Sequence, residues 1–361
     1  MTMDIDTMTN VILNNPYDLK EEIKNSNGKK PKKGKNKSKK KKTKKSFKKT
    51  LFKLLKTLIV LFILGIIFLF LFFKTSLFQK YKELWVQTAM STMNHQYLAT
   101  WFLSDEEIAE IMQKLAVENS ENSDPSKIKI TNKSNEIKVE KITGKNYVGY
   151  VMIIGNPGRV QLVDSRQKTT GTQLSQIVKE KGAIAGINAG GFADDGGHGK
   201  GNKLVDAVII DKKLVNGDTK TRYSLIGLSK EGKLILGKYT YQEAINAGIK
   251  SAVEFGPFLI VNGNKQIKNE NSGGIQPRMA IGQKRDGTLI FVSIDGRQPG
   301  YSLGATLLEL QSIFEKYGAY NAANLDGGSS ATMYYENKLV NKPSTPMGER
   351  YLPNAFIVKN E

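Results

Sequence analysis

The sequence has no cysteine, and its 361 residues include only two histidines, His95 and His198. The absence of cysteine excludes disulfide scaffolds, cysteine-ligated zinc, iron–sulfur clusters and thiol nucleophiles. Two histidines are too few for a multi-histidine metal site, so no cofactor is predicted, and a role for a metal ion stays an open alternative. Acidic residues are also scarce, because 34 Asp and Glu stand against 54 Lys and Arg, which gives a net charge of +20.

Most of the positive charge lies in one segment. Residues 29–56 contain 16 Lys and no acid, whereas residues 1–28 carry two Lys and five acids. The +16 and the −3 of these segments leave +7 for the rest of the chain. A low-complexity run does not indicate a nucleic-acid-binding fold, and no nucleic-acid partner is expected. Contact of residues 29–56 with anionic lipid is one interpretation, and a solvated topogenic signal is the other.

A single transmembrane helix is predicted at 57–73, where the sequence TLIVLFILGIIFLFLFF runs for 17 residues without a charge. A helix of this length covers about 25 Å, close to the thickness of the bilayer's hydrocarbon core. No small-residue cleavage site follows it, so we expect a retained anchor. Because the lysines precede the span, the N-terminus, with residues 1–28 as a disordered tip, is expected in the cytoplasm. The C-terminal domain is then extracellular, as in a single-pass protein of a Gram-positive cell membrane.

Residues 74–126 are predicted as a helical stalk with a linker. Residues 78–101 mix aromatic residues with good helix formers, and Ser104 and Glu107 form a capping box that opens a helix to about Val117. The polar residues 121–126 contain a proline and are interpreted as the linker into the domain at 127–361.

Short apolar runs separated by turns predict an α+β domain with a mostly antiparallel sheet and a few packed helices at 127–361. The predicted strands are 147–154, 183–187, 205–210, 224–228, 257–261, 279–282, 289–294 and 355–358. Helical periodicity appears at 172–180, 241–246 and 306–317. Hairpin turns are predicted at Asn216-Gly217, Glu231-Gly232, Asn262-Gly263 and Asp286-Gly287.

Two segments place an asparagine and paired glycines at the end of a buried strand. They are INAGGF at 187–192 and NLDGGSS at 324–330. Paired glycines let the backbone turn sharply and approach a ligand closely, although each segment is also compatible with a plain tight turn. Arg278 and Arg297 lie at further strand ends, where two guanidinium groups can hold a phosphate. Either arginine alone is more typical of a surface ion pair.

Familiar catalytic and nucleotide-binding motifs are missing. The segment at 327–331 departs from the nucleophile elbow, and a Ser-His triad has no suitable histidine beyond His198. Neither a Walker loop nor GxGxxG occurs. Residues 193–198 contain two aspartates and a histidine, but their spacing differs from that of a calcium loop, so a flexible loop is the preferred interpretation.

Five segments together resemble the phosphodiester glycosidase family, which includes the N-acetylglucosamine-1-phosphodiester α-N-acetylglucosaminidase type and bacterial exopolysaccharide-associated relatives. They are INAGGF at 187–192, GPFLIVNG at 256–263, QPRMAIGQ at 276–283, DGRQPGYSLGATLLEL at 295–310 and NAANLDGGSSATM at 321–333. The last two are the most specific. The family often has threonine after the Pro-Arg pair, where this chain has Met279.

The resemblance implies hydrolysis of the bond between a sugar and a phosphodiester, with a phosphorylated glycan or sugar phosphodiester as partner. The residues carried over as site residues are Asn188, Gly190, Gly191, Arg278, Asp295, Arg297, Asn324, Asp326, Gly327, Gly328 and Ser329. A phosphodiester is a weakly basic leaving group, so donors to its growing negative charge matter more than an acid. The arginines and the 327–329 turn are the predicted donors, with Asp326 as first and Asp295 as second choice for the catalytic carboxylate.

The leading hypothesis is therefore a membrane-anchored extracellular hydrolase of glycosyl phosphodiesters of wall teichoic acid or exopolysaccharide type. A non-catalytic protein that binds or assembles phosphorylated polysaccharide is the main alternative. A transferase that passes the sugar phosphate to an acceptor is a third.

Overall fold

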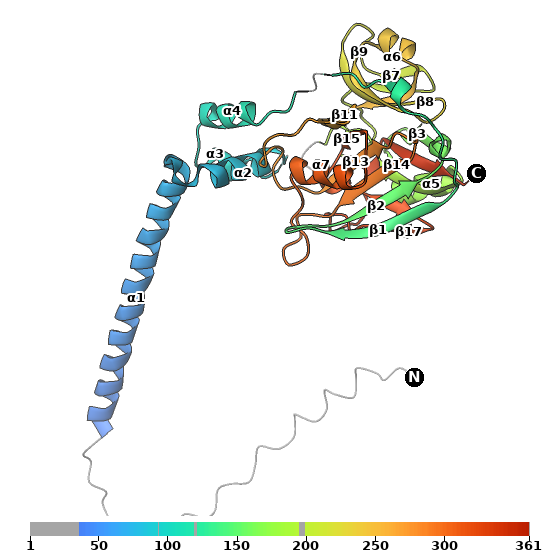
Figure 1. The fold of residues 1–361 in the computed structure, drawn as a ribbon. Coiled ribbons are helices and arrows are strands. Elements are labelled where there is room, and N and C mark those ends of the chain that lie inside the picture. Colours follow the sequence, from blue (N-terminus) through green and yellow to red (C-terminus); the bar gives the residue numbers. More distant parts are fainter. Residues whose placement is uncertain (1–35, 93, 119–120, 195–198, 361) are drawn as a thin grey trace, which may run out of the picture. The chain divides into compact units, whose positions relative to one another are not determined.

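The structure is a computed structural model that describes residues 36–360 except 93, 119–120 and 195–198 (Figure 1). The predicted tip at 1–28, and residues 29–35, lie outside the described residues. The chain divides into two compact units, 1–67 and 68–361.

A long helix, α1 (Asn36–Lys74), contains the predicted span at 57–73. Its segment Ser46–Lys74 is long and apolar enough to cross a membrane, and its most apolar window of 18 residues has a mean hydropathy of 2.9. None of its most apolar window is buried against other parts of the chain. By its length and composition, this segment of α1 is a candidate membrane span.

Three short α-helices follow within the second unit, in the segment that was predicted as a helical stalk. They are α2 (Gln79–Met90), α3 (Tyr97–Thr100) and α4 (Asp105–Lys114). Val86, Ala99 and Ile111 are buried in a small core that these helices share with Phe73. The rings of Phe73 and Phe102 stack with their centroids 4.5 Å apart.

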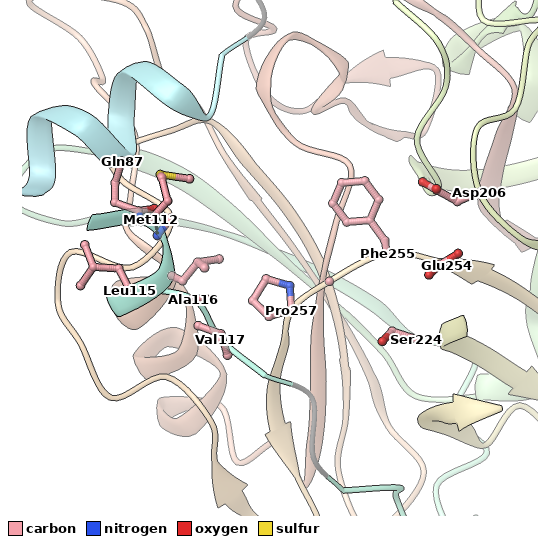
Figure 2. Close-up of a pocket in the computed structure, with 13 residues that line it drawn as sticks. Gln87, Met112, Leu115, Ala116, Val117, Asp206, Ser224, Glu254, Phe255 and Pro257 are labelled. Carbon is pink, nitrogen blue, oxygen red and sulfur yellow. Dashed lines mark hydrogen bonds between the residues drawn. The ribbon is translucent and has the colours of Figure 1, made fainter. Parts of the chain in front are cut away.

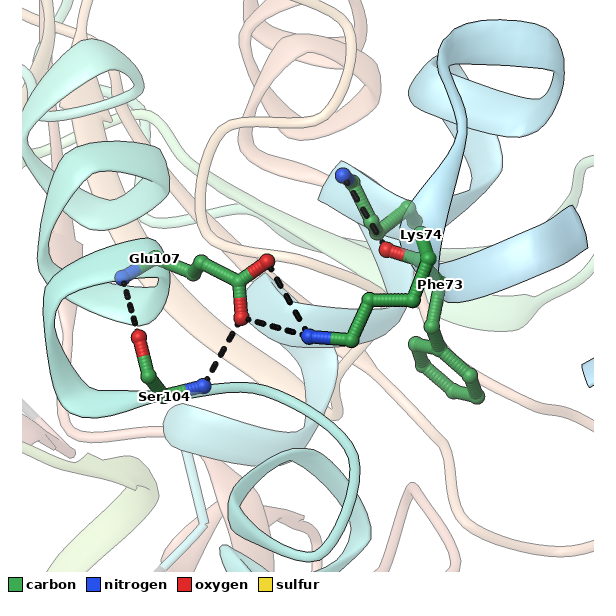
Figure 3. A network of polar contacts seen from close by, with 5 residues as sticks. Phe73, Lys74, Ser104 and Glu107 are labelled. Carbon is green, nitrogen blue, oxygen red and sulfur yellow. Dashed lines mark hydrogen bonds and ion pairs between the residues drawn. The ribbon is translucent and has the colours of Figure 1, made fainter. Parts of the chain in front are cut away.

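The predicted capping box begins α4. The Glu107 N–H donates to the Ser104 hydroxyl at 3.3 Å, and the Ser104 N–H donates to the Glu107 carboxylate at 2.9 Å (Figure 3). Lys74 forms an ion pair with the same carboxylate at 3.0 Å, which links the end of α1 to the start of α4.

The domain is built from antiparallel sheets, which confirms the predicted fold class. The largest sheet has seven strands, in the order β1 (Ile137–Thr143), β2 (Val148–Ile154), β14 (Leu289–Ile294), β13 (Arg278–Gln283), β15 (Asn321–Leu325), β11 (Phe258–Val261) and β12 (Asn264–Lys265).

Two five-stranded sheets complete the domain, with a small two-stranded ribbon. One sheet has the order β7 (Lys213–Asn216), β6 (Val208–Ile210), β10 (Ile249–Glu254), β8 (Tyr223–Ser229) and β9 (Leu234–Tyr239). The other has the order β17 (Lys338–Leu339), β16 (Met333–Tyr335), β5 (Ala183–Asn188), β19 (Asn354–Lys359) and β3 (Val160–Asp164). The ribbon pairs β18 (Tyr351–Leu352) with β4 (Thr172–Gln173).

The main core lies between one face of the seven-stranded sheet and the two smaller sheets. Phe291 of β14, Ile187 of β5 and Val253 of β10 are fully buried there. The opposite face of the seven-stranded sheet is covered by α7 (Leu307–Lys316), whose Leu310 and Phe314 are also fully buried. Both faces of the central strands are therefore apolar, and polar site residues emerge where those strands end.

The remaining α-helices of the described residues are α5 (Leu174–Glu180), which packs on β5, and α6 (Tyr241–Asn246), which packs on β10. The predicted helix at 172–180 begins later than expected, because its first two residues form β4. The predicted hairpin turn at Asn216-Gly217 is wrong. The chain turns between β6 and β7 at Asp211 and Lys212, which adopt positive φ angles of 47° and 64°.

The predicted linker at 121–126 is held by hydrogen bonds to the domain. The Ser123 N–H donates to the Leu236 carbonyl at 2.7 Å, and the Leu236 N–H donates back to the Ser123 hydroxyl at 2.8 Å. The Asp124 N–H donates to the side chain of Asn262 at 2.8 Å. This segment therefore lies along β9 instead of crossing open solvent.

Candidate active site

One edge of the seven-stranded sheet collects the predicted charged residues. β13 lies between β14 and β15 and is antiparallel to both. The start of β13 therefore meets the ends of its two neighbours. Arg278 is the first residue of β13, and Asp295 and Asp326 directly follow β14 and β15.

Arg278 is a buried cation held by backbone carbonyls. Its Nη2 donates to the carbonyls of Gly273 at 2.6 Å and Gly274 at 2.8 Å, and its Nε donates to that of Ala305 at 3.1 Å. Burial, and then the nearby charge of Arg297, lower the pKa of Arg278 to about 9. Among the described residues it forms no ion pair with a carboxylate, so its charge is available to an anion.

Arg297 lies over the predicted glycine turn. A Cβ atom built on Gly328 stands 3.4 Å from both terminal nitrogens of the guanidinium. The side-chain oxygen of Gln276 accepts from Arg297 Nε at 3.1 Å and from Nη2 at 2.7 Å. Arg297 reaches solvent, yet the protein atoms around its guanidinium desolvate it and lower its pKa, an effect that Asp326 opposes. Two arginines in mutual Coulombic contact, neither paired with a carboxylate within the described part of the chain, favour an anionic ligand.

Asp326 carries the most perturbed carboxyl group of this edge. It is partly exposed, but its surroundings are poorly solvated, and this burial raises its pKa to about 7. The Ser330 hydroxyl, Arg350 and Arg297 act in the opposite direction, whereas the carboxylate of Asp194 raises the pKa further. A carboxyl with a pKa near 7 that keeps solvent access is typical of a catalytic group.

Arg350 and Asp194 complete this cluster and were not among the predicted site residues. Arg350 binds the Asp194 carboxylate through two hydrogen bonds of 2.7 Å and donates to the Ser329 hydroxyl at 3.0 Å. Its guanidinium lies over the Phe192 ring, 4.9 Å from the centroid. The predicted loop at 193–198 thus contributes Asp194 to the cluster, while residues 195–198 lie outside the described residues.

The two glycine-pair segments, 187–192 and 324–330, are hydrogen-bonded to each other. The Asp326 N–H donates to the Ala189 carbonyl at 3.1 Å, and the Asn188 side chain donates to the Asp326 carbonyl at 2.6 Å. The Asn188 side-chain oxygen accepts from the Thr332 N–H at 3.0 Å. Asn188 therefore fixes the backbone on both sides of the 326–330 turn and is not directed at a ligand.

The glycines of this region allow close packing. A Cβ atom on Gly190 would stand 3.1 Å from Val253, and one on Gly191 would stand 3.3 Å from the Phe255 ring. The N–H of Gly328 donates to the Pro277 carbonyl at 2.9 Å. The expectation that this N–H binds phosphate is therefore wrong, because the group is already hydrogen-bonded. Gly327 approaches the same carbonyl, since a Cβ atom there would lie 2.6 Å from it.

Asp295 belongs to a separate network. Its carboxylate accepts from the Tyr301 hydroxyl at 2.9 Å, the Asn341 side chain at 3.1 Å and the Lys342 N–H at 2.9 Å. It is 1% exposed, and burial raises its pKa despite these donors. Three donors and full burial are the features of a structural carboxylate, so we interpret Asp295 as a support for the 297–302 loop.

A cavity of about 550 Å³ lies next to this edge (Figure 2). One wall carries Asp206 and Glu254, whose pKa values are raised by burial, and the opposite wall comes from the end of α4 and residues 115–117. Phe255 separates the cavity from the Gly190-Gly191 turn. The Asn324 side chain donates to the carbonyl of Gly256, another residue that lines the cavity, at 2.8 Å. The buried side-chain oxygen of Asn324 has no hydrogen-bond partner within the described part of the chain.

A family model for phosphodiester glycosidases matches residues 181–359. This range contains Asp326, both arginines and the two glycine-pair segments. Residues 181–359 belong to the phosphodiester glycosidase family. β1 and β2, which precede this range, form one edge of the seven-stranded sheet.

Similar proteins include the SPbeta prophage-derived uncharacterized protein YomE of Bacillus subtilis, 28% identical over 173 residues. That alignment covers 46% of this chain and 27% of YomE. The N-acetylglucosamine-1-phosphodiester alpha-N-acetylglucosaminidase of Mus musculus is 27% identical over 178 residues, which cover 44% of this chain and 32% of the mouse protein. The chain thus spans less than a third of the length of either relative.

The catalytic domain of the zebrafish N-acetylglucosamine-1-phosphodiester alpha-N-acetylglucosaminidase has a similar structure, with a TM-score of 0.52 and 20% identity. The match covers 66% of this chain and 87% of the zebrafish chain. At this identity the likeness concerns the fold, which agrees with the predicted class of antiparallel sheets and packed helices.

Proposed function

We propose that this protein hydrolyses the bond between a sugar and the phosphate of a glycosyl phosphodiester. The observation that carries the proposal is the position of Asp326, a carboxyl with a pKa of about 7, near Arg297. Arg297 forms no ion pair with a carboxylate among the described residues. Family membership of residues 181–359 and the activity in the name of the mouse relative support the same chemistry.

Phosphate binding is assigned to the arginine side of the site. Arg297 presents its guanidinium above the Gly328 turn, and the charge of buried Arg278 adds to the positive potential. Both groups stabilise the negative charge that grows on the phosphate as it leaves. The Ser329 hydroxyl accepts from Arg350 and keeps its own proton as a further donor.

Asp326 is assigned to the sugar side. Water adds to the anomeric carbon, the bond from that carbon to the phosphate oxygen breaks, and the phosphate leaves with the electron pair. Ionised Asp326 either takes the proton of the attacking water or stabilises positive charge on the sugar ring. Both roles require the carboxylate, so the reaction should quicken as the pH rises through about 7.

We further propose that α1 anchors the protein in the cell membrane of a Gram-positive bacterium, with the N-terminus in the cytoplasm and the domain outside. The lysines before the span support this direction. The substrate is then a phosphorylated polymer of the envelope, of wall teichoic acid or exopolysaccharide type. The lysines at 29–56 are proposed to contact anionic lipid of the inner leaflet.

The test uses the full chain in detergent micelles. Wild type and Asp326→Asn are incubated with UDP-N-acetylglucosamine and with methyl phosphodiesters of N-acetylglucosamine and glucose, and free sugar is measured. We expect release by wild type and a loss of at least 100-fold in Asp326→Asn. Asp211→Asn is the matched control, because Asp211 is exposed at a positive φ that asparagine tolerates.

The same variants separate the enzyme from the non-catalytic alternative. If wild type releases no sugar from any substrate, and Asp326→Asn binds phosphorylated polymer as well as wild type does, the protein is a binding module. Sugar phosphate appearing on an added acceptor, with no free sugar, would identify the transferase instead.

A further inference from the structure

Helix α2 lies in direct backbone contact with the loop that precedes β13. A Cβ atom built on Gly274 would stand 2.5 Å from the Thr88 nitrogen and 2.7 Å from the Gln87 carbonyl carbon. Gly274 also has a positive φ of 60°. Only glycine fits this position, so the helix and the loop are packed without a side chain between them.

Hydrogen bonds join the two segments along this contact. The side chain of Gln87 accepts from the Gly273 N–H at 3.1 Å, and the Thr88 hydroxyl accepts from the Ile275 N–H at 3.1 Å. Gln87 is 4% exposed. These are buried, satisfied bonds, so the contact is a specific one.

Gln276 connects this contact to the site. Its Nε2 donates to the Thr88 carbonyl at 2.7 Å, and its Oε1 accepts the two hydrogen bonds from Arg297. A flipped amide would place N–H groups against N–H groups and an oxygen against a carbonyl, so both ends fix its orientation. The Thr88 carbonyl lies in the last turn of α2, where a helix leaves its carbonyls without internal partners. The Gln276 amide therefore provides a hydrogen-bond partner both for a carbonyl at the end of α2 and for the guanidinium of Arg297.

The backbone of Gln276 is fixed independently of its side chain. It pairs with Ala305, with N–H to carbonyl distances of 3.2 and 3.0 Å. Gln276 is 3% exposed and lies at the loop end nearest to Arg278. Replacement of its side chain by an apolar one of similar length thus removes the link and leaves the chain path in place.

We propose that Gln276 is a positioning residue for the phosphate-binding Arg297, and that α2, outside the family's matched range, is a working part of the site. The proposal rests on the proposed function, in which Arg297 binds the phosphate. Oriented by the amide, the guanidinium keeps Nη1 for the substrate, since Nε and Nη2 are engaged. Gln87, Met112 and residues 115–117 also line the neighbouring cavity, so the helical segment contributes to both the arginine contact and the cavity.

The test is a double-mutant cycle on the full chain in detergent, with the dissociation constant for UDP-N-acetylglucosamine measured by calorimetry. We compare Gln276→Met, Arg297→Met and the double variant. Loss of the oriented arginine should weaken binding by about tenfold in Gln276→Met. Because Gln276 acts through Arg297, the double variant should bind as Arg297→Met does, within about twofold. Gln242→Met, at an exposed position of α6, is the control and should bind like wild type.

A variant in α2, Thr88→Val, tests whether this helix contributes to substrate binding. Thr88→Val removes the acceptor of the Ile275 N–H without changing the shape of the side chain. It should weaken binding by about threefold in the wild-type background and have no effect in the Arg297→Met background. The thermal midpoint of each variant is recorded, and a variant that has lost its cooperative transition is replaced by Gln276→Asn or Thr88→Ala.

Each outcome has one meaning. Losses that multiply in the double variant identify Gln276 as a merely structural residue and overturn the inference, as does wild-type affinity in Gln276→Met. An unchanged Thr88→Val overturns the role of α2. Binding without hydrolysis by wild type contradicts the proposed function alone, whereas absence of any binding by wild type overturns both.

Discussion

The guanidinium of Arg350 donates two hydrogen bonds of 2.7 Å each to the carboxylate of Asp194. The two side chains are only 12% and 13% exposed, and both act electrostatically on Asp326. Asp194 raises the pKa of Asp326 and Arg350 lowers it. One ion pair therefore exerts two opposing electrostatic effects on the proposed catalytic carboxyl of Asp326.

Substitutions in this pair should move the pH profile in opposite directions. Asp194→Asn removes a negative charge, so the acidic limb of kcat/KM is expected at lower pH than in wild type. Arg350→Met removes a positive charge and should move the limb to higher pH. The measurement is sugar release from UDP-N-acetylglucosamine between pH 5 and 9, and shifts in the same direction in both variants would contradict the assignment of Asp326.

The ionisation of Asp326 should also make the stability of the fold depend on pH. Its folded pKa of about 7 lies above the ordinary value of 3.8, so the folded state holds this proton more tightly than the unfolded state does. Its contribution is then greatest at low pH and is lost as the pH rises from about 4 to about 7. Asp326→Asn should therefore gain thermal midpoint relative to wild type across that window.

Thermal midpoints at pH 4, 5.5, 7 and 8 test this expectation, with Asp211→Asn as the control. A constant difference between Asp326→Asn and wild type over the whole range would mean that the folded pKa of Asp326 is not raised.

Substitution of Arg278 should lower the stability of the fold more than substitution of Arg297 does. Arg278 satisfies three buried carbonyls, which a lysine cannot all reach, so Arg278→Lys should cost about 1–3 kcal/mol of unfolding free energy. Arg297→Lys, at an exposed position, should stay within about 0.5 kcal/mol of wild type and mainly weaken substrate binding. Chemical unfolding and calorimetric binding measure the two effects, and equal stability losses would show that Arg297 also supports the fold.

The fold could be predicted from the sequence where a strand is a continuous apolar run. The predicted strand at 289–294 coincides with β14, and the predicted helix at 241–246 coincides with α6. The strand at 137–143 was missed, because the charges of Lys138, Glu140 and Lys141 interrupt its apolar residues on both faces and it lies at the sheet edge. The turn at Asp211-Lys212 has no glycine, so its positive φ angles follow from pairing of the flanking strands.

The candidate site could be predicted in part, where polar residues adjoin the end of a buried strand. Arg278 and Asp326 could be found in this way, since glycine pairs and strand ends are visible in the sequence. Arg350 and Asp194 could not, because they are 156 positions apart and meet only through tertiary structure. The role of Gln276 was equally hidden, since it depends on a helix 188 positions earlier in the chain.

The proposed topology can be tested with unusual clarity because the chain has no cysteine. A single cysteine is placed at one of two exposed lysines, in Lys48→Cys within α1 or Lys213→Cys within β7. With the domain outside, a membrane-impermeant maleimide should label Lys213→Cys on intact cells and should label Lys48→Cys only after permeabilisation. Each variant removes one lysine, and 15 of the 16 at 29–56 remain in Lys48→Cys, so the charge bias that sets the orientation is preserved. The reverse labelling pattern would place the domain in the cytoplasm and remove the envelope polymers from the range of substrates.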